Sequence, residues 1–267
     1  MALIRIARAP FGGALRLASR INYLLRPHEY RYVFILALRR SGSSLLAHII
    51  TSHPDFIGAG ETHTTYRHQS DLPKLIPRTS QLLRQLDLRR VPYIVDKITM
   101  DQYLVDDKIL ASPLIHKCVI LIRSPEGALR SLMDRYGFGE EVAGNIYANR
   151  LKTLARYGET LRGRAILIEY EQILEGTDAT LAVLTQFFNT ARPFTPNYTT
   201  HKATGKMGDP SLNIFSGRVI RTPGHHVNVN PEVMLKATQA FHEQRCRLWN
   251  AGVAVVCKPE NRNLLSE

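Results

Sequence analysis

The chain has 267 residues, of which 44% are hydrophobic, and a formal net charge of +12 at pH 7. This length and apolar content predict one sizeable core and a single α/β domain. The three cysteines show neither a disulfide framework nor a zinc-ligand spacing, and no stretch reaches the roughly 18–20 apolar residues that span a bilayer. The positive charge suits nucleic acid, an anionic membrane surface, a polyanionic small molecule or simply a basic soluble surface.

Residues 1–27 form a basic arm in which arginines interrupt leucine, isoleucine and alanine. This arrangement is a poor secretory signal. Residues 14–26 could form an amphipathic helix on an anionic membrane, or a helix packed on the domain, or a frayed end. We therefore divide the chain into an arm at 1–27 and one domain at 28–267. We expect a cytoplasmic protein, with peripheral membrane contact through the arm as an open alternative.

Strand and helix patterns alternate along the domain. Buried strands are predicted from 32, at 56–61, 93–98, 118–122 and 165–170. Helices are predicted to 50, at 81–88, 101–111, from 125, at 140–161, at 178–189 and around 241–248. Ser124 is expected to cap the helix that begins at Pro125, Asp101 to cap or start the next helix, and Trp249 to lie in the core. The alternation indicates a three-layer, P-loop-like α/β fold in which helices flank a central parallel sheet.

A short polar loop joins the first strand to its helix. It consists of Arg39, Arg40, Ser41, Gly42, Ser43 and Ser44. Small residues there expose backbone N–H groups at a helix N-terminus, which is an arrangement that binds phosphate-like anions. The nucleoside-triphosphate loop is G-x-x-x-x-G-K-[ST]. Aligned on Gly42, this chain has Ala37 for the first glycine and Ser43 for the lysine, which argues against the β/γ-phosphates of ATP.

Polar residues also follow other strands of the predicted sheet. Glu61, Lys97 and Arg123 lie at or near strand ends, where parallel sheets bind their ligands. Ser131 follows Arg123 by eight positions, and an arginine with a serine can share the oxygens of one phosphate. This gives two predicted anion sites, one at Arg40 and its loop and one at Arg123.

The ordered motifs RRSGSSLL, VILIRSPEGALRSLM and ILIEYEQIL resemble the sulfotransferases that use 3′-phosphoadenosine 5′-phosphosulfate (PAPS). The resemblance covers about 32–255 and does not include the arm. It implies that the loop at 39–44 binds the 5′-phosphosulfate and that Arg123 and Ser131 bind the 3′-phosphate. Independently, Arg40 is positioned to stabilise charge on the leaving 5′-phosphate.

Glu61 is the candidate general base. The resemblance implies a glutamate near the second strand as the base in the membrane-associated branches that modify carbohydrate or tyrosine. The chain resembles the carbohydrate, tyrosylprotein and bacterial branches more than the cytosolic branch that sulfates phenols and steroids. The cytosolic branch uses a Lys-Thr-His motif instead, and this chain has Lys97-Ile98-Thr99 there. His63 and Asp96 are weaker candidates for the base. Lys97 is either a contact to the transferring sulfuryl group or a solvated lysine.

The late segment 202–211 resembles the loop that closes over the nucleotide, so Lys206 and Gly208 are candidate contacts, with Arg218 and Arg221 as further options. No metal site is expected. The acceptor loops are predicted at 62–79 and 136–147. We expect transfer of a sulfuryl group from PAPS to a hydroxyl of a glycan, lipid-linked or small-molecule acceptor, anionic as one alternative, with no specific nucleic acid partner. The alternatives are a P-loop kinase using ATP and Mg²⁺, and a non-enzymatic basic adaptor.

Overall fold

The computed structural model describes residues 30–85, 91–103, 105–201, 204–205, 211–221 and 228–256. The arm at 1–27, with its predicted amphipathic helix, lies outside these residues, as do Lys206 and Gly208. Within the described part of the chain, no helix is both long and apolar enough to cross a membrane.

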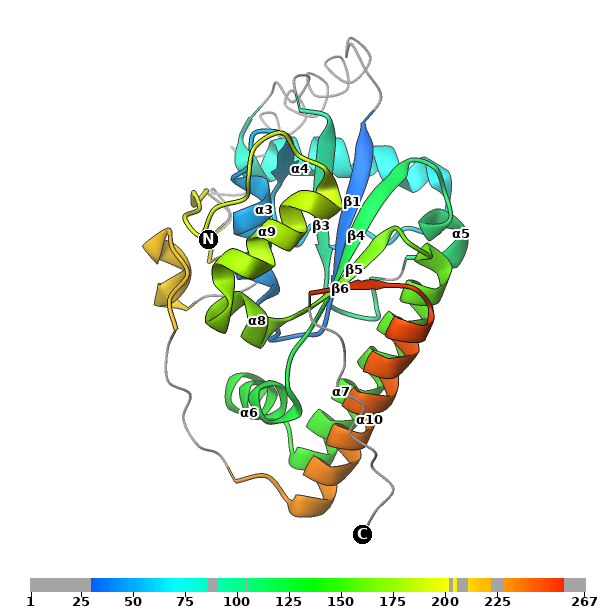
Figure 1. Cartoon of the computed structure of the whole chain (residues 1–267), viewed down its shortest axis with the longest axis vertical. Coiled ribbons are helices and arrows are strands. Elements are labelled where there is room, and N and C mark those ends of the chain that lie inside the picture. Colours follow the sequence, from blue (N-terminus) through cyan, green and yellow to red (C-terminus); the bar gives the residue numbers. More distant parts are fainter. Residues whose placement is uncertain are drawn as a thin grey trace, which may run out of the picture.

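Six parallel strands form one central sheet in the order β2-β3-β1-β4-β5-β6 (Figure 1). The strands are β1 Arg31–Ala37, β2 Phe56–Gly58, β3 Tyr93–Ile98, β4 Ile115–Ile122, β5 Ala165–Glu169 and β6 Ala254–Val255. The α-helices are α3 Ser43–Thr51, α4 Leu75–Leu83, α5 Asp107–Leu110, α6 Pro125–Tyr136, α7 Glu140–Leu161, α8 Tyr170–Glu175, α9 Thr177–Phe188 and α10 Pro231–Asn250. Two 3₁₀ helices are η1 Gln69–Lys74 and η2 Leu212–Ser216. The predicted α/β fold with a parallel sheet is confirmed.

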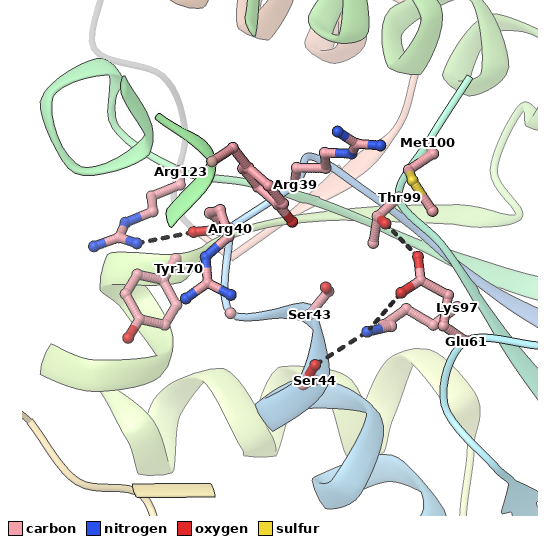
Figure 2. A pocket seen from close by; sticks show the side chains of 12 residues that line it. Arg39, Arg40, Ser43, Ser44, Glu61, Lys97, Thr99, Met100, Arg123 and Tyr170 are labelled. Atoms are coloured by element: carbon pink, nitrogen blue, oxygen red, sulfur yellow. Dashed lines mark hydrogen bonds and ion pairs between the residues drawn. The ribbon is translucent and has the colours of Figure 1, made fainter. Parts of the chain in front are cut away.

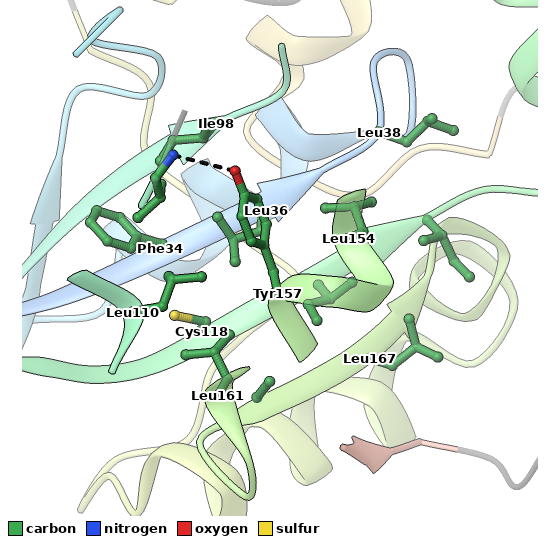
Figure 3. Packing of buried hydrophobic residues seen from close by; sticks show 14 of the residues in the cluster. Phe34, Leu36, Leu38, Ile98, Leu110, Cys118, Leu154, Tyr157, Leu161 and Leu167 are labelled. Atoms are coloured by element: carbon green, nitrogen blue, oxygen red, sulfur yellow. Dashed lines mark hydrogen bonds between the residues drawn. The ribbon is translucent and has the colours of Figure 1, made fainter. Parts of the chain in front are cut away.

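The central strand β1 is buried on both faces, which explains its continuous apolar sequence. Phe34 and Leu36 point into the cluster that contains residues of α5, α7 and α10 (Figure 3). Val33 and Ile35 point into the opposite cluster, which α3, α8 and α9 cover. Helices therefore cover both faces of the sheet, as the three-layer prediction requires.

The strand order also determines where a ligand can bind. The chain leaves β1 toward β2 on one side, and leaves β4 toward β5 on the other. Because these connections diverge, a crevice opens between the carboxyl ends of β1 and β4. The loop at 39–44 follows β1, and Arg123 follows β4, so both predicted anion sites lie at this crevice.

Several predicted boundaries were wrong. Strand β2 ends at Gly58, so Glu61 lies in the loop beyond it. Helix α4 begins at Leu75, well before 81, because its first turns bury apolar residues under the sheet edge. Helix α5 covers four residues of the expected 101–111 segment.

Ser124 occupies the N-cap position of α6 before Pro125, as predicted, but its hydroxyl makes no capping bond and donates instead to Glu171 Oε1 at 2.8 Å. Two other expected roles for single residues were wrong. Asp101 accepts a hydrogen bond at 2.6 Å from the buried guanidinium of Arg150, and neither starts nor caps α5, whose N-cap is Asp106. Trp249 is 39% exposed at the end of α10, because the apolar face of that helix is completed by Leu248.

Candidate active site

The loop after β1 is shaped by two residues in the left-handed region. Arg40 has φ 62° and Gly42 has φ 77°. A Cβ at position 42 would lie 2.2 Å from the Tyr170 ring, so only glycine fits. The Ser41 hydroxyl points inward and donates to the Leu38 carbonyl at 2.6 Å, so this serine fixes the turn. The turn aims the first N–H groups and the positive dipole end of α3 into the crevice.

Glu61 and Lys97 meet at the N-terminus of α3 (Figure 2). Lys97 Nζ lies 3.6 Å from Glu61 Oε2 and donates to Ser44 Oγ at 3.0 Å. The other carboxylate oxygen of Glu61 accepts a hydrogen bond from the Thr99 hydroxyl. Both Glu61 and Lys97 are buried, so this lysine is not the solvated strand-end residue that was one of its two interpretations.

Arg123 and Ser131 both lie beside Arg40. Arg40 Nε donates to Ser131 Oγ at 3.0 Å, and the Arg40 carbonyl accepts from Arg123 at 2.8 Å. The Arg123 guanidinium lies 4.6 Å over the centre of the Tyr170 ring, and its Nε is buried without a hydrogen-bond partner. Burial lowers the pKa of Arg123, against the raising influence of Tyr170 and Glu171. The Nε faces Gly127, and Arg123 belongs to the lining of the same pocket as Arg40.

These residues enclose a pocket of about 350 Å³. Its lining consists of Arg39, Arg40, Gly42, Ser43, Ser44, Glu61, Lys97, Thr99, Met100, Arg123, Tyr136 and Tyr170. Four of the lining side chains are cationic and one is a carboxylate, so the pocket favours an anionic ligand. In the described part of the chain, no group of three or more His, Cys, Asp and Glu residues could hold a metal ion.

The two weaker candidates for the base lie apart from the pocket. Asp96 is fully buried behind it and accepts hydrogen bonds from Tyr66, Thr62 and the Lys97 amide. Burial raises the pKa of Asp96 to about 7, while those hydrogen bonds act in the opposite direction. His63 is exposed, and its ring stacks on Tyr103 at 4.7 Å. Asp96 therefore joins the segment after Glu61 to the strand that carries Lys97.

Sequence reasoning missed Thr99 and Met100 as pocket residues. Thr99 follows Lys97 by two positions, which brings it to the same strand end, and this spacing was the available signal. Arg221 is exposed and pairs with Glu175 at 3.1 Å, and Arg218 is not among the pocket residues. Of the predicted acceptor loops, 136–147 contributes Tyr136 to the pocket, whereas 62–79 contributes none of its lining residues.

No family model and no curated protein matches this chain. Solved structures do match. The structure of mouse sulfotransferase SULT7A1 in complex with PAP (3′,5′-adenosine bisphosphate) matches this chain with a TM-score of 0.51 and 13% sequence identity. The match covers 87% of this chain and 93% of the mouse chain. A sulfotransferase from Alicyclobacillus acidocaldarius has a TM-score of 0.48 and 14% identity, covering 84% of this chain and 96% of its own. The chain has a sulfotransferase-like fold. At these identities the mouse structure supports the fold alone.

Proposed function

We propose that this protein transfers a sulfuryl group from PAPS to a hydroxyl acceptor. The observation that carries the proposal is the position of Glu61. Its carboxylate lies between the Lys97 ammonium and the Thr99 hydroxyl, at the N-terminus of α3. It lines the same pocket as Arg40 and Arg123. A base, an anion cradle and leaving-group cations are the components that such a transfer requires.

Each component has a defined part in the reaction. Glu61 takes the proton of the acceptor hydroxyl as its oxygen forms a bond to sulfur. The bond between sulfur and the bridging oxygen of the 5′-phosphate breaks, and 3′,5′-adenosine bisphosphate (PAP) leaves with that oxygen. Arg40, Lys97 and the first turn of α3 stabilise the negative charge that develops on the phosphate. The reaction balances without a metal or a redox cofactor.

The second anion site fits the 3′-phosphate of the same nucleotide. Arg123 lines the pocket above the Tyr170 ring, and Ser131 on helix α6 accepts a hydrogen bond from Arg40. The mouse structure with a similar fold was crystallised with PAP, which supports PAP as the product to test here. We include Gly42, Ser43 and Ser44 in the nucleotide site, and Lys206 and Gly208 as contacts from the late loop.

A kinase using ATP and Mg²⁺ fits the geometry less well. Aligned on Gly42, Ser44 takes the place of the Ser/Thr whose hydroxyl binds Mg²⁺ in the triphosphate loop. Here the Lys97 ammonium donates to that hydroxyl at 3.0 Å. A cation from β3 therefore occupies the position where a metal ion would be coordinated, and this disfavours a kinase.

The proposal is tested by measuring PAP release from PAPS with a panel of phenols, alcohols and sugars. We expect acceptor-dependent release in the wild type. Glu61→Gln should lower the turnover by about 10²–10⁴ while PAP binds with unchanged affinity. Near wild-type turnover of Glu61→Gln would show that another group is the base, and absence of release with every acceptor class would count against the transfer itself.

A further inference from the structure

A second cavity of about 230 Å³ adjoins the pocket that contains Glu61. The two cavities share Arg39, Thr99 and Met100 in their linings. The Thr99 hydroxyl donates a hydrogen bond to Glu61, so a residue shared by the two cavities contacts the candidate base. We call this second space the acceptor cavity. It is smaller than the roughly 300–1,000 Å³ of a complete ligand site, so it fits the reacting end of a molecule.

The wall of the acceptor cavity is partly apolar. Leu38 from the loop after β1, Met100 from the loop after β3 and Ile146 from α7 contribute to it. Such side chains favour a hydrocarbon or aromatic surface on the molecule that carries the hydroxyl. Ile146 belongs to the segment 136–147, in which the sequence analysis predicts an acceptor loop.

The charges in the acceptor cavity are not balanced. The charge of the Arg150 guanidinium is paired with Asp101 at 2.6 Å, and the same group also donates to the Ala37 and Ile98 carbonyls at 3.0 and 2.8 Å. Arg39 lies 5.4 Å over the Tyr136 ring and, among the described residues, forms no ion pair. One net positive charge therefore remains in the cavity, and Arg39 carries it.

The Arg39 side chain also points away from the nucleotide side of the pocket. Figure 2 shows it extending toward Met100, whereas Arg40 and Arg123 lie together on the other side beside Tyr170. Arg39 was expected to contact the nucleotide because it belongs to the loop at 39–44. Its direction and its place in both linings indicate a role toward the acceptor instead.

We infer that the acceptor cavity binds the reacting end of a hydroxy acid, with a short apolar body against Met100 and Ile146 and an anionic group on Arg39. This inference rests on the proposed function for the identity of the reaction. A planar guanidinium binds a carboxylate or sulfate with two parallel hydrogen bonds, so Arg39 distinguishes anionic acceptors from neutral ones of the same shape.

The test measures binding of matched probes, so it does not require knowledge of the natural acceptor. Protein labelled at the methionine and isoleucine methyl groups is titrated with 4-hydroxyphenylacetate and with its neutral amide, with and without saturating PAP. We expect the Met100 and Ile146 methyl signals to shift, and the acid to bind about tenfold or more tightly than the amide. Arg39→Gln should remove this preference, and Arg135→Gln, an exposed arginine on α6, should retain it.

The outcomes separate the two proposals. Equal affinity for acid and amide, a preference that persists in Arg39→Gln, or no shift at Met100 and Ile146 up to the solubility of the probes would each overturn the acceptor cavity. Methyl β-glucuronide and methyl β-glucoside form a second pair. Tighter binding of the glucuronide than of the phenolic acid would overturn the apolar part of the inference. A failure of PAP to bind would count against the proposed function alone.

Discussion

The buried carboxyl group of Asp96 gives this protein a predictable pH dependence of stability. The group accepts hydrogen bonds from the Thr62 amide at 3.1 Å, the Thr62 hydroxyl at 2.9 Å, the Tyr66 hydroxyl at 2.7 Å and the Lys97 amide at 3.0 Å. Burial raises its pKa from 3.8 to about 7. The substitution Asp96→Asn removes the ionisation and keeps the size of the side chain.

The sign follows from proton binding. Between pH 4 and 7 the folded protein retains a proton on Asp96 that the unfolded chain releases, so the free energy of unfolding falls as pH rises. The stabilisation is complete below about pH 4 and is lost as pH approaches 7. A shift of about three pKa units corresponds to about 4 kcal/mol. Asparagine cannot ionise, so its contribution to the free energy of unfolding does not change with pH. Its NH₂ group faces the hydrogen-bond donors around position 96, which destabilises the variant by about 1–3 kcal/mol at every pH.

Urea unfolding of the wild type and Asp96→Asn from pH 4.5 to 8 measures the effect. The stability advantage of the wild type should shrink by about 4 kcal/mol or somewhat less across this range, because the titration begins near pH 4. Asp71→Asn serves as the control. The Lys74 hydrogen bond lowers the pKa of Asp71 to about 2, so the contribution of Asp71 is lost only as pH falls below about 4 and is constant in the range tested. An advantage of the wild type over Asp96→Asn that stays constant or grows with pH would refute the reasoning.

Three further predictions concern the pocket. Arg123→Ala should lower PAP affinity at least about tenfold in calorimetry, since it removes a charge-assisted phosphate contact of roughly 1.5–3 kcal/mol. The control Arg156→Ala on the surface should leave PAP affinity unchanged. Equal PAP affinities of Arg123→Ala and the wild type would remove Arg123 from the site. Gly42→Ala should lower the free energy of unfolding by at least about 1–2 kcal/mol and weaken PAP binding, because position 42 has φ 77° and no room for a Cβ beside Tyr170. A variant with wild-type stability and wild-type PAP affinity would contradict this packing. Thr99→Val removes the hydrogen bond to Glu61 and should lower kcat about tenfold with PAP affinity unchanged. Thr99→Ser keeps the hydroxyl and should restore kcat. Unchanged kcat in the valine variant would show that this hydrogen bond is dispensable.

The fold was largely predictable because its signals are local. Continuous apolar strands and helical periodicity gave the alternation of the parallel sheet, and helix α7 covers the predicted 140–161. Boundaries failed where long-range packing decides them. Helix α4 begins early because Leu75 and Ile76 are buried in the core cluster. Trp249 is exposed because its neighbour Leu248 completes the buried face of α10, and adjacent residues of a helix point in different directions.

The site was predictable to the extent that strand ends coincide in space. That rule brought Arg40, Glu61, Lys97 and Arg123 to one edge, and the structure places all four in one pocket. It could not give side-chain direction. The inward turn of Ser41, the direction of Arg39 toward the acceptor cavity and the hydrogen bond from Thr99 depend on backbone geometry and neighbours that are distant in sequence.

The central claim is that the crevice between β1 and β4 binds a PAPS-type nucleotide. Calorimetric titration with PAP and, separately, with ATP and Mg²⁺ tests it most directly. We predict saturable PAP binding without a divalent cation and weaker binding of ATP with Mg²⁺. Preference for ATP with Mg²⁺ would contradict the claim and favour a kinase. Absence of a saturable nucleotide site, together with steeply salt-dependent binding to anionic polymers or vesicles, would contradict it and favour a basic adaptor.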